Sequence, residues 1–178
     1  MFRRIVNFIK KRANKEELLD FEYYTFTDLF EKNIDEKVEV IHCETDQVFL
    51  KKLSTKLKDF GEASVFSSAN FKDKVSVPVL DVSGQSYEKG DWYLFEADFG
   101  FVENSRLLIS NFSINGLNFF DLPKNLVVVL KRTSILNTLN DCMKGIKDKY
   151  ATNDFTVHSL SLSKVSPNLQ RIVVFIKP

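Results

Sequence analysis

Five polar residues in the second half of the chain could bind or transform a small anionic molecule. Asp98 and Glu103 are carboxylates on either side of a short apolar run; either could bind a ligand, and Glu103 could also act as a general base. Arg106 can hold an anion through its forked guanidinium. Ser163 and Lys164 together offer a hydroxyl and a point charge to a phosphate or carboxylate. Structural roles remain open for all five, because either acid can belong to a turn, Arg106 can pair with an acid, and Ser163-Lys164 can form a solvated loop.

The sequence offers little support for metal, nucleophilic or cofactor chemistry. Cys43 and Cys142 are far apart in apolar surroundings, and His42 and His158 each occur alone in an expected strand. Zinc sites need ligands in closer groups, so we expect no metal and two buried thiols. Walker, GxGxxG and GxSxG motifs are absent from the sequence, and we therefore expect no bound cofactor. Reduced thiols suit a reducing compartment.

Composition and charge exclude several classes of protein. The 178 residues, 44% of them hydrophobic, are sufficient for one globular domain without disulfides. A net charge of +1 argues against a general nucleic-acid binder, which needs an excess of basic residues. No apolar run approaches the roughly 18 residues of a membrane span, and the basic N-terminus lacks the features of a signal peptide. We expect a cytoplasmic protein without a transmembrane segment.

The chain is expected to divide into an N-terminal segment, residues 1–24, and a single α/β domain, residues 25–178. Apolar residues at helical spacing, separated by basic ones, predict a short amphipathic helix at Phe2–Ile9, and a linker comes after it. An acidic stretch begins at Glu16. The basic helix could dock on its own domain, on a partner or on an anionic membrane, and its shortness favours docking.

The first part of the domain has the pattern of a strand–helix–strand unit. A short helix is expected to open at Thr25 and run through Phe30, followed by a strand at residues 38–42. Thr45 can cap a helix whose apolar face repeats at three-to-four-residue spacing and which ends at Gly61 (the face is Leu50, Leu53, Leu57 and Phe60). A strand at residues 63–66 completes the unit, which implies parallel strands. A further strand at residues 75–80 contains Pro78, which indicates a sheet edge or an irregular strand end.

The remaining pattern predicts local hairpins and then a return to α/β structure. Short apolar runs at residues 92–97, 99–102 and 107–109 have brief connections that favour hairpins, and Asn115–Gly116 indicates a turn. The aliphatic run at 126–130 predicts a strand covered on both faces. A helix capped by Thr133 or Ser134 should come next, with strands at residues 155–162 and 172–176 after it (its apolar stripe would be Ile135, Leu139, Cys142, Ile146 and Tyr150). We therefore predict a three-layer α/β/α fold, with a mainly parallel sheet and an antiparallel insertion.

The segment Glu96–Ile109 resembles a motif of the LUD (lactate-utilisation) domain family. That family carries Ala-Asp, an apolar pair, Ile-Ala-Glu-Thr-Gly-Thr and then an aliphatic strand. Here the corresponding sequence is Ala-Asp-Phe-Gly-Phe-Val-Glu-Asn-Ser-Arg before the strand at Leu107. The family also has a Leu-Pro before a hydrophobic strand and a helix, and Leu122-Pro123 resembles it in standing before the expected strand and helix. The likeness extends from about residue 38 to the C-terminus.

The resemblance implies a fold, a cleft and a cellular setting. LUD domains share the fold of sugar-phosphate isomerases, CoA transferases and a folate cycloligase, in which Glu103 would face a cleft at a strand end. The resemblance further implies a C-type subunit without cluster cysteines, acting beside iron–sulfur subunits in lactate utilisation. Two departures stand out. Asn104-Ser105-Arg106 replaces Thr-Gly-Thr, which removes a glycine, and only Ser163-Lys164 remains of the family's C-terminal loop motif.

Three functions stay open on the sequence. The first is an accessory or ligand-binding LUD component linked to lactate or organic-acid use. The second is an enzyme of the same fold acting on an anionic small molecule, with Glu103 as its candidate catalytic residue. The third is a structural or interaction domain whose site has degenerated. The altered motifs favour the first and third, and the sequence leaves catalysis undecided.

Overall fold

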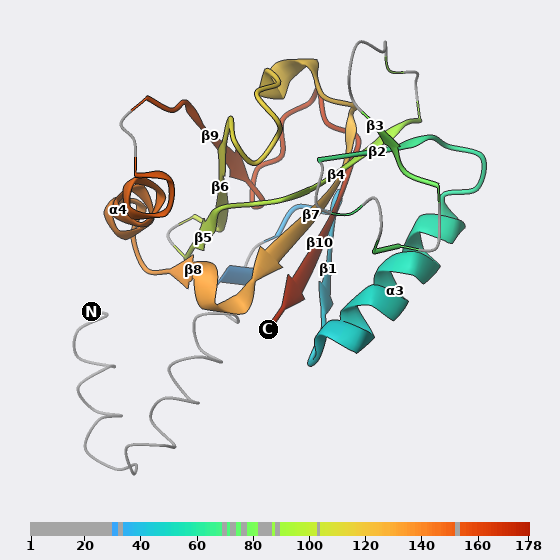
Figure 1. Ribbon diagram of the computed structural model, residues 1–178, viewed down its shortest axis with the longest axis horizontal. Coiled ribbons are helices and arrows are strands. Elements are labelled where there is room, and N and C mark those ends of the chain that lie inside the picture. Colours follow the sequence, from blue (N-terminus) through green and yellow to red (C-terminus); the bar gives the residue numbers. More distant parts are fainter. Residues whose placement is uncertain are drawn as a thin grey trace.

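The computed structural model describes residues 30–31, 34–68, 71, 74–75, 78–81, 87, 90–102, 104–151 and 154–178 (Figure 1). The predicted N-terminal helix and linker lie outside these residues, as does the candidate Glu103. Most of the short helix predicted from Thr25 also lies outside them, but Phe30 and Glu31 are helical. Phe30 is fully buried and packs close to Gly100. A Cβ added at Gly100 would come nearest to the side chains of Leu130 and Phe30.

A six-stranded, wholly parallel sheet forms the centre of the molecule. Its strand order is β1-β10-β7-β4-β2-β3. The strands are β1 (Val38–His42), β2 (Val65–Ser67), β3 (Leu80–Asp81), β4 (Trp92–Glu96), β7 (Asn125–Lys131) and β10 (Arg171–Lys177). The aliphatic run predicted at residues 126–130 is the buried β7, between β10 and β4. Of the strand predicted at residues 75–80, only Leu80 belongs to β3. β3 lies at the edge of the sheet, and Pro78 comes before it rather than within it.

The predicted strand–helix–strand unit is confirmed, and its two strands are well separated in the sheet. Helix α3 (Asp46–Asp59) starts at Thr45, whose hydroxyl accepts a hydrogen bond from the Val48 amide, and ends just before Gly61 at φ 68°. Its buried face consists of Phe49, Leu53 and Leu57. β1 and β2 are parallel, with β10, β7 and β4 lying between them in the sheet.

A second, four-stranded sheet contains the predicted antiparallel insertion, but it is a mixed sheet, since one of its three strand pairs is parallel. Its order is β8-β5-β6-β9, with strands β5 (Phe99–Phe101), β6 (Arg106–Ser110), β8 (Ile135–Leu136) and β9 (Val157–Ser161). β5 and β6 form the expected hairpin, but β4 does not join them. It pairs in parallel with β2 and β7, so the expectation that residues 92–97 form a local hairpin is wrong. A short connection to β5 does not require pairing with it, because the chain crosses from one sheet to the other at Ala97–Asp98.

Helix α4 (Leu139–Tyr150) begins later than predicted. Its N-cap is Thr138, whose hydroxyl accepts a hydrogen bond from the Asp141 amide. Thr133 and Ser134 instead belong to the short 3₁₀ helix η2 (Arg132–Ser134), and Ile135 lies in β8. The chain therefore uses Ile135 to extend the second sheet before the helix starts. A second 3₁₀ helix, η1 (Phe119–Asp121), precedes β7.

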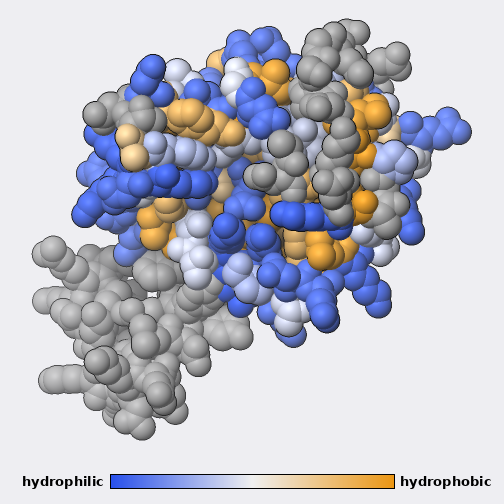
Figure 2. Space-filling view, viewed as in Figure 1, coloured by the Kyte–Doolittle hydropathy of each residue, from blue (hydrophilic) through white to orange (hydrophobic). Residues whose placement is uncertain are grey.

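Two hydrophobic cores on opposite faces of the parallel sheet confirm the predicted layered α/β fold. Val127 and Val129 face α3 and share one cluster with its buried residues, Phe49, Leu53 and Leu57. Leu126, Val128 and Leu130 face the second sheet, which is backed by α4 (Figure 1). Figure 2 shows hydrophilic residues over α4 and hydrophobic ones nearer α3, β2 and β3. In the part of the chain described, no helix is both long and apolar enough to cross a membrane.

Candidate functional site

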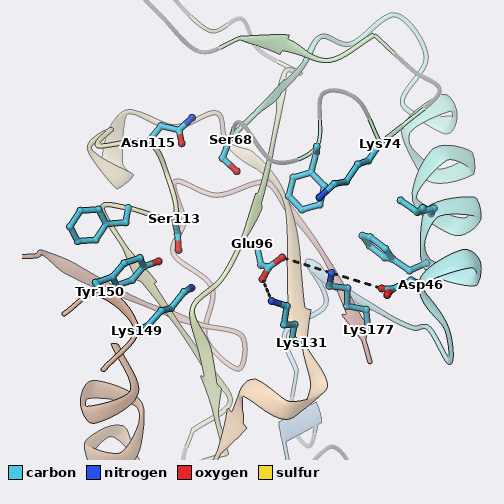
Figure 3. Close-up of a pocket in the computed structure, with 14 residues that line it drawn as sticks. Asp46, Ser68, Lys74, Glu96, Ser113, Asn115, Lys131, Lys149, Tyr150 and Lys177 are labelled. Carbon is cyan, nitrogen blue, oxygen red and sulfur yellow. Dashed lines mark ion pairs between the residues drawn. The ribbon is translucent and has the colours of Figure 1, made fainter. Parts of the chain in front are cut away.

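A cleft of about 760 Å³ lies where three strands of the parallel sheet end. Glu96, Lys131 and Lys177 are the last residues of β4, β7 and β10, and all three line it (Figure 3). The carboxyl edge of a parallel sheet is the usual ligand-binding edge of α/β proteins. The start of α3 forms one wall of the cleft, and the end of α4 with residues 112–115 forms the other. Its volume is in the range of about 300–1,000 Å³ usual for small-molecule pockets.

A chain of alternating charges crosses the floor of this cleft. Lys131 Nζ is 3.1 Å from Glu96 Oε1, and Lys177 Nζ is 3.9 Å from Glu96 Oε2. Lys177 Nζ is also 3.9 Å from Asp46 Oδ1 and lies over the Phe49 ring, 5.3 Å from its centroid. The two 3.9 Å separations are too long for hydrogen bonds. Lys177 is therefore held between two carboxylates without a direct hydrogen bond to either, which leaves its ammonium protons available to a ligand.

Asp98 lies beneath the wall formed by the end of α4 and residues 112–115, and its carboxylate holds this wall in place. Its side chain is completely buried and accepts four hydrogen bonds. Lys149 Nζ and Tyr150 Oη, both from the end of α4, donate to Oδ1 at 2.8 and 2.6 Å. The Ser110 amide and the Ser113 hydroxyl donate to Oδ2, each at 2.7 Å. One carboxylate thus joins the end of β6, the following loop and the end of α4.

The Asp98–Lys149 pair is charged although Asp98 is completely buried. Burial alone would raise the pKa of Asp98, but hydrogen bonds from Lys149, Tyr150, Ser113 and the Ser110 amide outweigh it and hold this pKa below its ordinary value. Burial would conversely lower the pKa of Lys149, but its hydrogen bonds to Asp98 and Tyr150 and the charge of Asp98 hold that pKa above its ordinary value. The aspartate is therefore committed to internal partners.

A stacked aromatic pair completes this wall. The Phe112 and Tyr150 rings have centroids 4.5 Å apart with an interplanar angle of 30°. Asn115 adopts φ 54° and Gly116 φ 75°, which confirms the predicted turn. This turn brings Ser113 and Asn115 to the cleft, where their polar side chains are drawn (Figure 3). The wall therefore combines an aromatic surface with hydroxyl and amide groups.

The cleft carries an excess of positive charge. Its lining residues include four lysines, Lys74, Lys131, Lys149 and Lys177, and two carboxylates, Asp46 and Glu96. With Asp98 beneath Lys149, the charges of the described residues in and under the cleft still sum to plus one. Ser68, Ser113 and Asn115 add neutral hydrogen-bonding groups. Such a lining can bind a carboxylate or phosphate by charge-assisted hydrogen bonds.

The structure separates the residues predicted from the sequence. Asp98 lies beneath the cleft, whereas Arg106 and Lys164 line a second groove. Arg106 begins β6 and Ser110, which binds Asp98, ends it, so the two positions are about 13 Å apart at some 3.3 Å per residue. Arg106 donates to the Ser159 hydroxyl, and the Ser163 hydroxyl donates to the Asn104 carbonyl near that groove. Asp98 is thus not brought together with the other predicted residues that the structure describes.

The histidines and cysteines have separate surroundings. His42 contacts Glu31, and the His158 ring stacks on Phe119 with centroids 5.5 Å apart. Cys43 and Cys142 are buried free thiols, as predicted. Burial raises the pKa of Cys43, and it raises that of Cys142 to about 12, so both favour the unreactive thiol form. No group of three or more potential metal ligands occurs among the described residues.

The main residues of the cleft were not found from the sequence. Glu96, Lys131 and Lys177 share one signal, since each is the polar residue that ends an apolar strand. That signal points to one site only when the strands are known to be parallel neighbours, because then their ends meet at one edge. Lys149 and Tyr150 carried no separable signal, since they read as the end of an amphipathic helix.

Comparison with known proteins supports the fold. No protein-family model and no curated protein matches the chain. Among solved structures, the chain is similar to a DUF162 family protein from Deinococcus radiodurans. The TM-score is 0.68 at 15% sequence identity, and the alignment covers 88% of this chain and 98% of that one. At this identity the likeness establishes a shared fold over nearly the whole domain.

Proposed function

We propose that this chain is a LUD-type domain that binds a small organic anion in the cleft at the ends of β4, β7 and β10. The observation that carries the proposal is the lysine-rich lining of that cleft at the carboxyl edge of the sheet. In this role the protein is an accessory, ligand-binding component of lactate or related organic-acid use in the cytoplasm. Iron–sulfur subunits of lactate utilisation are its proposed partners.

Two observations support the link to the LUD family. DUF162, the family of the structural neighbour, is the LUD family. The family glycine missing from the motif corresponds to Ser105, whose φ of 48° lies in the left-handed region that favours glycine. The backbone conformation that a glycine would adopt is therefore present here without the glycine. The relation to sugar-phosphate isomerases and CoA transferases belongs to the same proposal.

An enzyme acting on an anionic substrate is the second candidate, and Glu96 is the observation that favours it. This carboxylate lies in the cleft with its side chain 24% exposed, between Lys131 and Lys177. It could act as a base or nucleophile toward a bound molecule. Binding without turnover needs fewer assumptions. The lysines proposed to bind the anion are also the ion-pair partners of Glu96, so this carboxylate is already engaged.

A thermal-shift screen of the full chain tests the proposal. The panel contains L-lactate, pyruvate, sugar phosphates, nucleotides, CoA esters and folates. A ligand at 100 times its Kd stabilises the fold by about 2.7 kcal/mol, which raises Tm by several degrees. We expect a saturable shift with at least one of these anions, and turnover by the purified protein would favour the enzyme.

Matched variants locate the bound anion. We expect the Lys131→Gln/Lys177→Gln double variant to lose the shift, and the exposed pair Lys51→Gln/Lys58→Gln on α3 to keep it. Lys164→Ala should also keep it, since Lys164 lines the other groove. Loss of the shift in Lys164→Ala but not in the cleft variant would place the site at the residues predicted from the sequence. The absence of any shift would contradict anion binding.

A further inference from the structure

A second groove, of about 620 Å³, lies at the opposite end of the parallel sheet from the cleft. It is lined by residues that precede two of the parallel strands, Lys124 before β7 and Leu169 before β10. All five residues of β9 line it as well. The groove is therefore separate from the proposed anion site, and nothing in the proposed function uses it.

β9 is the last strand of the second sheet as the structure describes it. Leu162, just after β9, donates its amide to the Ser105 carbonyl, and Thr156, just before it, accepts from the Asn111 amide. Hydrogen bonding alternates along an antiparallel strand, so Leu160 and His158 also face β6. The backbone groups of Val157, Ser159 and Ser161 consequently point away from β6, along the edge that a further strand would pair with.

Apolar side chains form much of the groove, and the charged residues described in its lining are all basic. Its lining residues include Phe119, Phe120, Leu122 and Leu169, and Phe120 is 79% exposed. Phe119 and Phe120 both contact the His158 ring, at centroid distances of 5.5 and 5.6 Å. Arg106, Lys124 and Lys164 also line the groove, and no Asp or Glu occurs among the described residues of its lining. An occupant must therefore offer apolar groups and negative charge together.

We propose that this groove binds an extended acidic segment of a partner protein, which pairs with the outer edge of β9 as a fifth strand. In an extended segment alternate side chains point to opposite faces, so apolar residues can pack against Phe119, Phe120 and Leu122 while acidic ones face the cations. Main-chain hydrogen bonds to Val157, Ser159 and Ser161 supply affinity that does not depend on the partner's sequence. Arg106 and Lys164 thereby bind carboxylates of a protein segment.

A labelled synthetic peptide tests this docking. The probe is a short fluorescein-labelled peptide in which glutamate alternates with valine or phenylalanine, titrated with the full chain by fluorescence anisotropy. We expect saturable binding that weakens as salt is raised, because exposed charges are screened over about 10 Å at 0.1 M. Amide chemical shifts of Val157, Ser159 and Ser161 should change in step with the anisotropy.

Two modified peptides separate strand pairing from simple charge attraction. The first carries lysine in place of glutamate and should not bind. The second keeps all glutamates but has N-methyl groups on alternate residues, so it cannot donate main-chain hydrogen bonds along one edge. Each register of methylation is made, and we expect one of the two to weaken binding at least tenfold.

Protein variants assign the contacts. We expect about tenfold weaker binding by Phe120→Ala and by the triple variant Arg106→Gln/Lys124→Gln/Lys164→Gln. Leu139→Ala, at another exposed apolar residue, and Lys51→Gln/Lys58→Gln/Lys147→Gln are the matched controls and should bind normally. The proposal is overturned if the acidic peptide shows no saturable binding at millimolar concentration, or if the lysine peptide or both N-methylated peptides bind as well. Binding to anionic phospholipid vesicles or to single-stranded RNA in place of the peptide would also overturn it.

Discussion

At the scale of single residues, Asp98 is the side chain on which the cleft wall depends most. Asn in its place keeps the size but has one acceptor oxygen and an NH₂ group, which would face donors from Lys149, Tyr150, Ser113 or the Ser110 amide. Breaking a buried pair by changing one partner costs about 3–5 kcal/mol. We expect Asp98→Asn to lower the free energy of unfolding by about 3 kcal/mol, because Lys149 can turn partly to water. Urea unfolding measures this, with the exposed Asp59→Asn as control.

The same residue predicts how stability depends on pH. Because the pKa of Asp98 is lowered in the folded state, its contribution is complete above its ordinary pKa of 3.8 and is lost as the pH falls through the folded value. The stability difference between the wild type and Asp98→Asn should therefore be constant near neutral pH and shrink below about pH 4. Lys149 gives the opposite pH dependence, because its pKa is raised in the folded state. Its contribution to stability is complete below its ordinary pKa of 10.5 and is lost as the pH rises through the folded value. A difference that grows on acidification would contradict the assigned ion pair.

At the scale of elements, Gly145 sets how closely α4 packs on the second sheet. A Cβ placed there would be 2.5 Å from Phe99 Cζ, closer than two carbons can approach. Alanine gains about 1 kcal/mol of helix propensity over glycine, whereas overpacking costs about 1–3 kcal/mol. We expect Gly145→Ala to destabilise the protein by roughly 1 kcal/mol, and Lys147→Ala on the exposed face to be neutral or stabilising. Restoring stability by adding Phe99→Leu would identify the clash as the cause.

The C-terminal end of α4 is expected to allow a stabilising change. Ala151 caps the helix with φ 49°, a left-handed conformation that costs a residue with a Cβ about 1 kcal/mol. Ala151→Gly should therefore raise the free energy of unfolding by about that amount. Ala63→Gly, at a residue without this conformation, should not. Equal effects of the two substitutions on Tm would show that the cap is not strained.

The elements also differ in how well local sequence predicts them. Local patterns located β7, β10 and α3. A continuous aliphatic run reflects a strand buried on both faces, as in β7 and β10, and a three-to-four-residue repeat reflects a helix buried on one face, as in α3. α4 was placed too early because Ile135 extends the same apolar spacing, although Thr138 and Asp141 carry the capping pattern. The sheet to which β4 belongs depends on contacts with β2 and β7, which no local pattern contains. For the same reason the sequence did not point to Glu96, Lys131 and Lys177, which meet only through the strand order. It did single out Asp98, but as a ligand-binding candidate, whereas the structure gives that carboxylate four internal partners.

At the scale of the whole molecule, the two sheets share one core, which bears on the predicted single domain at residues 25–178. Leu126 and Val128 of the parallel sheet pack in the same cluster as Leu107 and Leu160 of the second sheet. Domains that share a core unfold together, whereas independent ones unfold with separate midpoints. Probes placed on opposite sides of this core can distinguish the two cases.

The chain contains suitable probes of its own. Trp92, the single tryptophan, is 5% exposed in β4 and stacks on Phe60 at the end of α3, with centroids 3.8 Å apart. Cys142 lies in α4 on the far side of the second sheet, where burial raises its pKa to about 12, so it should react with thiol reagents only after opening. We expect Trp92 fluorescence and Cys142 labelling in a Cys43→Ala background to report one urea midpoint. Labelling of Cys142 well below the fluorescence midpoint would mean that α4 and the second sheet open independently, and would divide the predicted domain in two.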